Sequence, residues 1–183
     1  MMTIGHSTLP IGSFLRALKE NDCNLLVDVR RYPGSRRHPQ YGQKQLFSSL
    51  EKEGIQAAWR EGLGGRRPAE KDSLNTGWRN EGFRGYADYM QTPEFAHQLD
   101  WLMDQHPLNR VVIMCAEALP WRCHRSLIGD AVLARGGVVE DIFVVPDGTS
   151  SRKPHGMTPF ARVEDGRLFY PTAKVDNMEL GFK

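Results

Sequence analysis

The chain has 183 residues, of which 40% are hydrophobic and 25% charged, a composition typical of a soluble globular protein with enough material for one domain. No apolar run reaches the length of a membrane span, and the first residues lack the apolar stretch of a signal peptide. The three cysteines form no disulfide framework, so we expect a cytoplasmic protein without membrane contact. A net charge of +2 does not by itself predict nucleic-acid binding.

Strands and helices alternate in the first third of the predicted fold. The apolar pattern predicts strands at residues 2–4, 25–30 and 55–59 and helices at residues 11–20 and 43–53. Residues 63–85 differ, because they are rich in glycine and arginine and carry Trp78 and Phe83. Irregular segments of this length are uncommon in compact domains unless they are functional, so we expect an irregular, arginine-rich insertion here.

The alternation continues in the second half of the chain. Thr92 and Pro93 predict the cap and first turn of a helix that ends near Pro107. A strand from about residue 110, a helix at 123–135, a strand at 138–145 and a hairpin around Asp165–Gly166 follow. The fold class is therefore α/β: one three-layer domain with a mainly parallel sheet of about five strands. We expect an α/β core at residues 1–148 and a tail at 149–183 whose hairpin packs on it.

Three of the predicted strands end in polar, reactive side chains. They are followed by His6 and Ser7, by Asp28 and Arg30, and by Cys115 with Glu117. In a parallel sheet these strand ends open onto the same edge, where such folds bind ligands. The sequence therefore predicts one site built from segments that lie far apart along the chain.

The most reactive segment is the run from Arg110 to Arg125, which brings two thiols, an imidazole, a carboxylate and a guanidinium within eleven residues. We expect Cys115 or Cys123 to be a nucleophile or redox thiol, because a helix N-terminus stabilises a thiolate. His124 is the candidate acid/base, and Glu117 is either a general base or the ion-pair partner of Arg125. The alternative is that both cysteines have only a structural role, as small buried hydrophobic residues.

Arginine supplies 17 of the 24 basic residues, and its planar fork suits phosphate and carboxylate groups. The candidate substrate-binding residues are His6, Ser7, Asp28, Arg30, Arg36 and Arg125. Other readings stay open: Asp28 and Arg30 could form a salt bridge with each other, and Arg125 could simply cap loop carbonyls.

The spacing of the cysteines bears on three known kinds of thiol site. Zinc could be held by Cys115, Cys123 and His124 with His6 or Asp28, but adjacent cysteine and histidine side chains seldom reach one ion. We therefore expect no metal and no other cofactor. Cysteine-dependent phosphatases place five residues between the nucleophile and the arginine, whereas six separate Cys115 from Arg122 here. The order of the segments is similar to that of a rhodanese-like sulfurtransferase, but the loop after Cys115 contains no glycine to direct its backbone amides inward.

The chain resembles a bacterial and archaeal family catalogued as domain of unknown function DUF 488. The motifs that carry the resemblance are Thr3–Ser7, Asp28–Arg30 with Pro33 and Ser35, Leu63–Gly65, Tyr86 with Phe95, Cys115–Glu117, Pro120 and Cys123–Arg125, with His155, Met157–Thr158 and Phe160–Ala161 in the tail. The resemblance implies a single α/β domain in which the polar strand ends are the family signature. It implies no particular reaction.

The leading hypothesis is a small enzyme that acts on an anionic, phosphate-bearing substrate such as a nucleotide or nucleic acid. One alternative is a non-catalytic nucleic-acid-binding module that uses the arginine clusters and the Trp78–Phe83 loop. Another is a Cys/His metal-binding domain.

Overall fold

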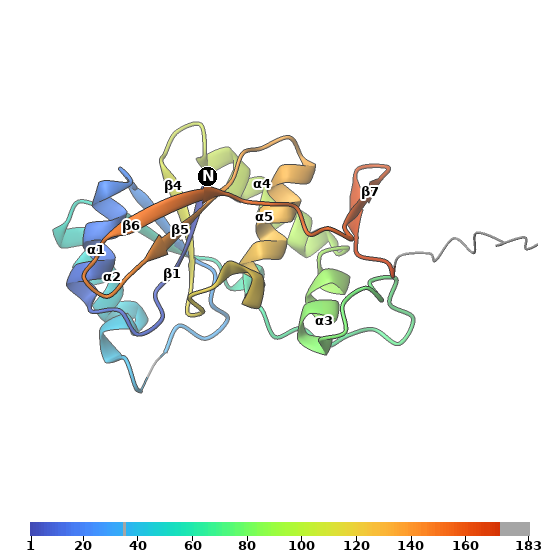
Figure 1. Ribbon diagram of the computed structural model, residues 1–183, viewed down its shortest axis with the longest axis horizontal. Coiled ribbons are helices and arrows are strands. Elements are labelled where there is room, and N and C mark those ends of the chain that lie inside the picture. Colours follow the sequence, from blue (N-terminus) through green and yellow to red (C-terminus); the bar gives the residue numbers. More distant parts are fainter. Residues whose placement is uncertain (35, 173–183) are drawn as a thin grey trace, which may run out of the picture.

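A six-stranded sheet forms the centre of the computed structural model, which describes residues 1–34 and 36–172 (Figure 1). The sheet order is β3-β2-β4-β1-β5-β6. Five strands run parallel and β6 pairs antiparallel with β5. The strands are β1 (Met2–Gly5), β2 (Leu25–Asp28), β3 (Gln56–Trp59), β4 (Val111–Cys115), β5 (Glu140–Val144) and β6 (Ser150–Pro154). The expected α/β class with a mainly parallel sheet is confirmed.

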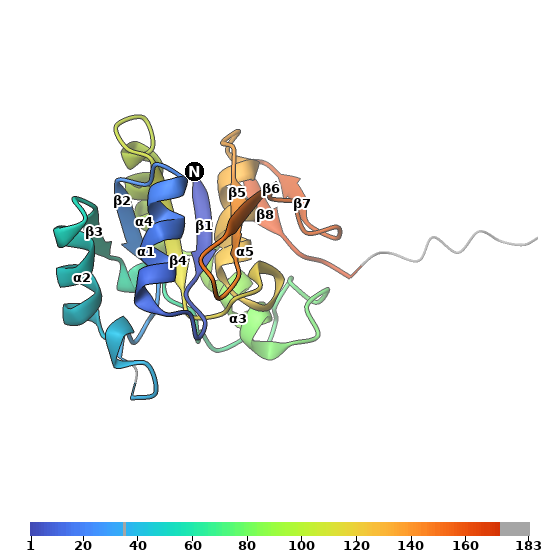
Figure 2. The ribbon, with the colours of Figure 1, turned by 60° about the vertical axis from the view of Figure 1, so that its left-hand side comes forward.

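Helices cover both faces of the sheet, with α1 (Ile11–Glu20) and α2 (Gln43–Lys52) on one face and α4 (Pro93–Gln105) and α5 (Arg125–Ala134) on the other (Figures 1 and 2). The alternation of side chains along β4 serves both layers. Val112 and Met114 pack toward α1 and α2, whereas Val111, Ile113 and Cys115 pack toward α4 and α5. Within the described ranges, no helix is long and apolar enough to cross a bilayer.

The expected irregular insertion at residues 63–85 is wrong at its end, because a further helix, α3 (Glu81–Tyr89), begins there. The side chain of Asn80 caps this helix by accepting a hydrogen bond from the Phe83 amide. The sequence pattern did not predict this helix because it contains Gly82 and Gly85, and glycine is a poor helix former. Gly85 is needed because a Cβ atom there would lie 2.2 Å from the Arg67 carbonyl oxygen.

The sheet has one strand more than the sequence predicted. Strand β6 has the sequence Ser-Ser-Arg-Lys-Pro and lies exposed at the sheet edge, so it carries no apolar alternation. Its backbone pairing with β5 defines it. The predicted hairpin is confirmed as β7 (Arg162–Glu164) and β8 (Arg167–Phe169), and Leu168 and Tyr170 beside it belong to the core cluster under α4 and α5.

The order of the strands creates a switch point between β1 and β4, which are neighbours in the sheet. The chain leaves β1 through α1 on one face and leaves β4 through α5 on the opposite face. Connections that diverge in this way leave a crevice outside the carboxyl ends of the two strands, where open α/β sheets bind ligands.

Candidate functional site

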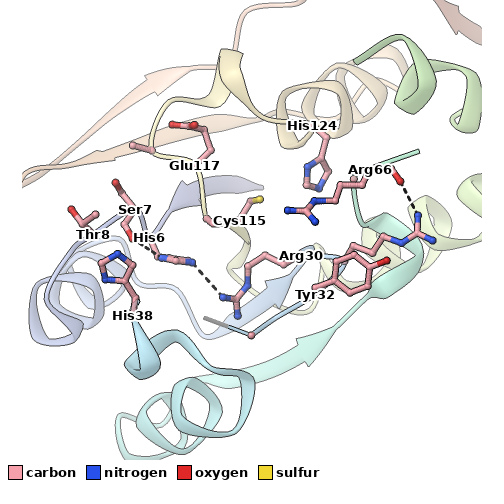
Figure 3. A pocket seen from close by; sticks show the side chains of 15 residues that line it. His6, Ser7, Thr8, Arg30, Tyr32, His38, Arg66, Cys115, Glu117 and His124 are labelled. Carbon is pink, nitrogen blue, oxygen red and sulfur yellow. Dashed lines mark hydrogen bonds between the residues drawn. The ribbon is translucent and has the colours of Figure 1, made fainter. Parts of the chain in front are cut away.

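A cavity of about 500 Å³ lies at this switch point. It is lined by the residues that follow β1, β2 and β4, together with the loop at residues 65–66 and the start of α5. Figure 3 shows Cys115 between the His6–Arg30 pair on one side and His124 with Arg66 on the other. The convergence expected from the parallel sheet therefore occurs.

Gly5, the last residue of β1, lets the loop after β4 come unusually close. A Cβ atom at this position would lie 1.9 Å from the Glu117 carbonyl oxygen and 2.9 Å from the Ala118 Cα. The approach allows backbone hydrogen bonds from His6 to the Cys115 carbonyl (3.0 Å) and from Ser7 to the Ala116 carbonyl (2.9 Å). Ser7 adopts a left-handed φ of 44°, a conformation that is concentrated at functional sites.

Arg125 holds the next two carbonyls of the same loop. Its side chain is fully buried and donates to the carbonyl oxygens of Glu117 and, at 2.7 Å, of Ala118, while Nε donates to the Thr3 hydroxyl (3.3 Å). Arg125 does not line the cavity. Its role in the structure is to fix the loop backbone.

The captured carbonyls decide where the amides of this loop point. In a trans peptide the N–H group points opposite to the C=O group, and no peptide bond of the described chain is cis. The N–H groups of Ala116, Glu117 and Ala118 therefore point away from β1 and Arg125. No described residue accepts a hydrogen bond from them. Successive backbone N–H groups without a protein acceptor can bind an anion where they face a cavity.

Arg30 is a nearly buried arginine whose orientation is fixed on three sides. It forms a bidentate pair with Asp28 (Nη2–Oδ2 2.6 Å) and donates to the Tyr41 carbonyl (2.8 Å) and to His6 Nε2 (3.3 Å). Four of its five N–H groups are used in this way, leaving one Nη2 hydrogen. The salt bridge with Asp28 thus coexists with an arginine that lines the cavity.

His6 orients Arg30 and stays neutral. Burial and the neighbouring Arg30 charge lower the pKa of His6 to about 4. Its Nδ1 hydrogen is directed at the Ser7 carbonyl (2.9 Å), so Nε2 accepts from Arg30. The ring stacks on Tyr41 with a centroid distance of 3.9 Å. His6 therefore acts as a support for the arginine.

Cys115, Cys123 and His124 form the reactive cluster, with their ligand atoms within 4.8 Å of one another. The hydrogen bond from the Cys115 thiol lowers the pKa of Cys123 to about 7 against the effect of burial, and the charge and backbone N–H of Arg125 add to this. The same bond and burial raise the pKa of Cys115. The contact between the two sulfurs thus shifts the pKa values of the two thiols in opposite directions.

His124 is oriented by a backbone carbonyl. Its Nε2 hydrogen is directed at the Val29 oxygen (3.0 Å), which leaves Nδ1 facing the Cys123 sulfur at 3.7 Å. Gly65 permits this placement, because a Cβ atom there would lie 2.8 Å from His124 Nδ1. The Cys123 sulfur thus lies next to a histidine that a backbone carbonyl orients.

The mouth of the cavity contains residues that sequence reasoning missed. Arg31 donates to the Arg66 carbonyl (3.0 Å), and both guanidinium groups lie near the exposed Tyr32 ring, at 5.8 and 5.7 Å from its centroid. Arg66 has a left-handed φ of 60°. The arginine clusters and the Gly64–Gly65 pair were the available signals, but nothing in the sequence placed this loop beside β2.

Apart from Arg125, the expected site residues fall into three groups. Six line the cavity: His6, Ser7, Arg30, Cys115, Glu117 and His124. Asp28 and Cys123 lie directly behind cavity residues that they contact. Arg36 is exposed and lies outside the cavity lining. The Glu117 side chain accepts a long hydrogen bond from the Leu119 amide (3.4 Å) and none from Arg125, whose donors go to two main-chain carbonyls and the Thr3 hydroxyl.

The aromatic residues of the 63–85 segment lie away from this cavity. Trp78 stacks on Phe83 (centroids 4.6 Å apart) and packs edge-on against Phe160 (4.9 Å). The two rings thus pack on the core cluster. The aromatic rings of this segment therefore pack against other side chains of the protein.

The protein is an open α/β sheet whose switch point carries a cavity lined by Cys115, His124 and several arginines, with Cys123 directly behind it. The chain belongs to the DUF488 family: the family model, described as a domain of unknown function, matches residues 10–132. The match includes Asp28–Arg30 and Cys115–Arg125. Neither the curated proteins nor the solved structures give a match.

Proposed function

We propose that this protein is a small enzyme that acts on an anionic, phosphate-bearing substrate through a cysteine nucleophile. One observation carries the proposal: a single cavity is lined by Cys115, by Arg30 and by residues 116–118, whose backbone N–H groups have no described acceptor. A volume of about 500 Å³ suits a phosphate group together with the group that it esterifies.

The phosphate is bound by groups that are already in place. The amides of residues 116–118 and the remaining Nη2 hydrogen of Arg30 supply donors, and Arg31 and Arg66 add positive charge at the mouth. These donors need no reorganisation, because Arg125, Asp28 and the β1 backbone hold them. For a nucleotide, the exposed Tyr32 ring offers a stacking surface for the base.

Cys115 is the nucleophile in this proposal, because it lines the cavity and Cys123 does not. The Cys115 proton passes through the Cys123 sulfur to His124 Nδ1, and the Sγ–P bond forms as the P–O bond to the leaving group breaks. His124 returns the proton to the leaving oxygen. Water then breaks the Sγ–P bond, which releases phosphate and restores the thiol.

Two alkylating reagents of different charge test the proposal on reduced protein kept free of metal by a chelator. Iodoacetate is an anion and iodoacetamide is neutral, so the ratio of their rates at Cys115, measured by peptide mass spectrometry, reports recruitment of anions. We expect this ratio to exceed that of glutathione by about tenfold or more. Inorganic phosphate should protect Cys115 competitively.

Exposed arginines provide matched variants for this experiment. Arg66→Gln should lower the rate ratio, whereas Arg122→Gln, next to the loop but outside the cavity, should leave it unchanged. A ratio equal to that of glutathione, together with no protection by phosphate, would refute the proposal.

A further inference from the structure

The geometry points to a zinc site: we propose that Cys115, Cys123 and His124 bind one Zn²⁺ ion, with the fourth position open to the cavity. The inference uses the same cavity as the proposed function but does not depend on the covalent reaction. Among the described residues, these three form the group whose donor atoms lie together, all within 4.8 Å. Two sulfurs and one imidazole nitrogen are ligands that favour zinc over magnesium or calcium.

The spacing of the donors fits a tetrahedral ion. With Zn–S of about 2.3 Å and Zn–N of about 2.0 Å, neighbouring ligands lie about 3.5–3.8 Å apart. His124 Nδ1 lies 3.7 Å from the Cys123 sulfur. The Cys115 sulfur needs to move by no more than about 1 Å to join them.

Adjacent cysteine and histidine side chains can reach one ion here because the backbone changes conformation between them. Cys123 is extended (φ −138°, ψ 142°), and His124 is helical (φ −55°, ψ −18°) at the cap of α5. The turn brings both side chains to the same side of the chain. This removes the objection that the sequence alone raised against a metal.

The supporting contacts are those of a metal-binding histidine. Ligating histidines almost always donate their second ring N–H to a carbonyl or carboxylate, which fixes the tautomer. His124 Nε2 lies 3.0 Å from the Val29 carbonyl oxygen, so the Nδ1 lone pair faces the two thiols.

Charge balance and access complete the site. Two thiolates neutralise Zn²⁺, so the ion can lie beside Arg30 and the other cationic residues of the cavity. Cys115 and His124 both line the cavity, which leaves the fourth ligand to water or to an anion. While both sulfurs bind the ion, Cys115 is not free to act as a nucleophile.

Cobalt is the probe that tests this site, because Co²⁺ takes zinc positions and reports sulfur ligands by charge-transfer absorption. We expect the reduced full-length protein to bind one Co²⁺ per chain with such a band and to release it to Zn²⁺. Cys23→Ala is the control, since Cys23 is buried on the other face of the sheet. Cys115→Ala and Cys123→Ala should each lower the affinity for Co²⁺ by more than the roughly 10–100-fold that is lost when a residue supporting a metal ligand is removed.

A second measurement on the unmodified protein covers the case in which a variant fails to fold. Stoichiometric Zn²⁺ should abolish alkylation of Cys115 by iodoacetamide, and a chelator should restore it. Absence of the charge-transfer band, an equal band in the Cys115 and Cys123 variants, or binding of Cu⁺ without Co²⁺ or Zn²⁺ would overturn the zinc assignment. Anion-selective alkylation of the metal-free protein is a separate readout, so the two proposals can fail independently.

Discussion

Gly5→Ala is the sharpest perturbation of the site, because a single methyl group placed in β1 would collide with the loop that carries the amides. The new Cβ atom would lie 1.9 Å from the Glu117 carbonyl oxygen, and the next nearest atoms are also backbone. An ordinary contact of 3.4 Å requires the loop to retreat by about 1.5 Å. That movement also pulls the Glu117 and Ala118 carbonyls away from Arg125.

The expected cost follows from these contacts. Overpacking costs about 1–3 kcal/mol, and each hydrogen bond to a charged group that weakens adds up to about 1.5–3 kcal/mol. We therefore expect the free energy of unfolding to fall by about 3 kcal/mol. In a chain of this size 1 kcal/mol lowers Tm by about 2–4 °C, so the loss corresponds to about 6–12 °C.

The assay combines thermal unfolding followed by circular dichroism with the ratio of iodoacetate to iodoacetamide rates at Cys115. Gly5→Ala should lower both Tm and the ratio. Gly12→Ala is the matched control, because a Cβ atom in this exposed turn of α1 meets nothing within 4 Å, and alanine favours the helix by about 0.5–1 kcal/mol. An unchanged Tm and rate ratio in Gly5→Ala would refute the account of the loop.

Two further predictions concern the histidines. Burial alone would lower the pKa of His155, but hydrogen bonds with Asp130 and Asp141 raise it from 6.5 to about 9. The protonated histidine therefore stabilises the folded state by about 3 kcal/mol. This contribution is complete below pH 6.5 and is lost as the pH rises through 9. Urea unfolding at pH 6 and pH 10 should show this loss, and a His155→Gln variant should show less of it. Gly65→Ala should displace the His124 ring and slow iodoacetamide alkylation of Cys115 about tenfold without changing the far-ultraviolet spectrum; an equal rate would argue against His124 as the base.

The meeting of the strand ends could be predicted from the sequence because it depends only on direction. Apolar strands separated by helices imply a parallel sheet, and a parallel sheet brings the residues after β1, β2 and β4 to one edge. His6, Arg30 and Cys115 could therefore be grouped without a structure. The exposed strand β6 has no apolar alternation, so its pairing could not be predicted by the same means.

The details of the site depend on backbone geometry that no spacing rule contains. The loop after β4 contains no glycine, yet its close approach to β1 depends on one, because Gly5 on that other strand provides the necessary room. Likewise, Cys123 and His124 converge because the chain turns between them. In the first case the deciding residue lies outside the motif, and in the second the deciding backbone angles lie within the motif but are not specified by its spacing.

Arg30 and Arg125 show how two arginines of one site come to have different roles. Both are almost fully buried, so each must satisfy its N–H groups within the protein. Arg30 has a carboxylate partner in Asp28, which neutralises its charge and leaves one donor for the cavity. Arg125 has no carboxylate within ion-pair distance among the described residues and meets neutral carbonyls instead. Its positive charge therefore stays uncompensated beside the thiols and, after the hydrogen bond from Cys115, helps to lower the pKa of Cys123, which favours a thiolate for a covalent reaction or for a bound zinc ion.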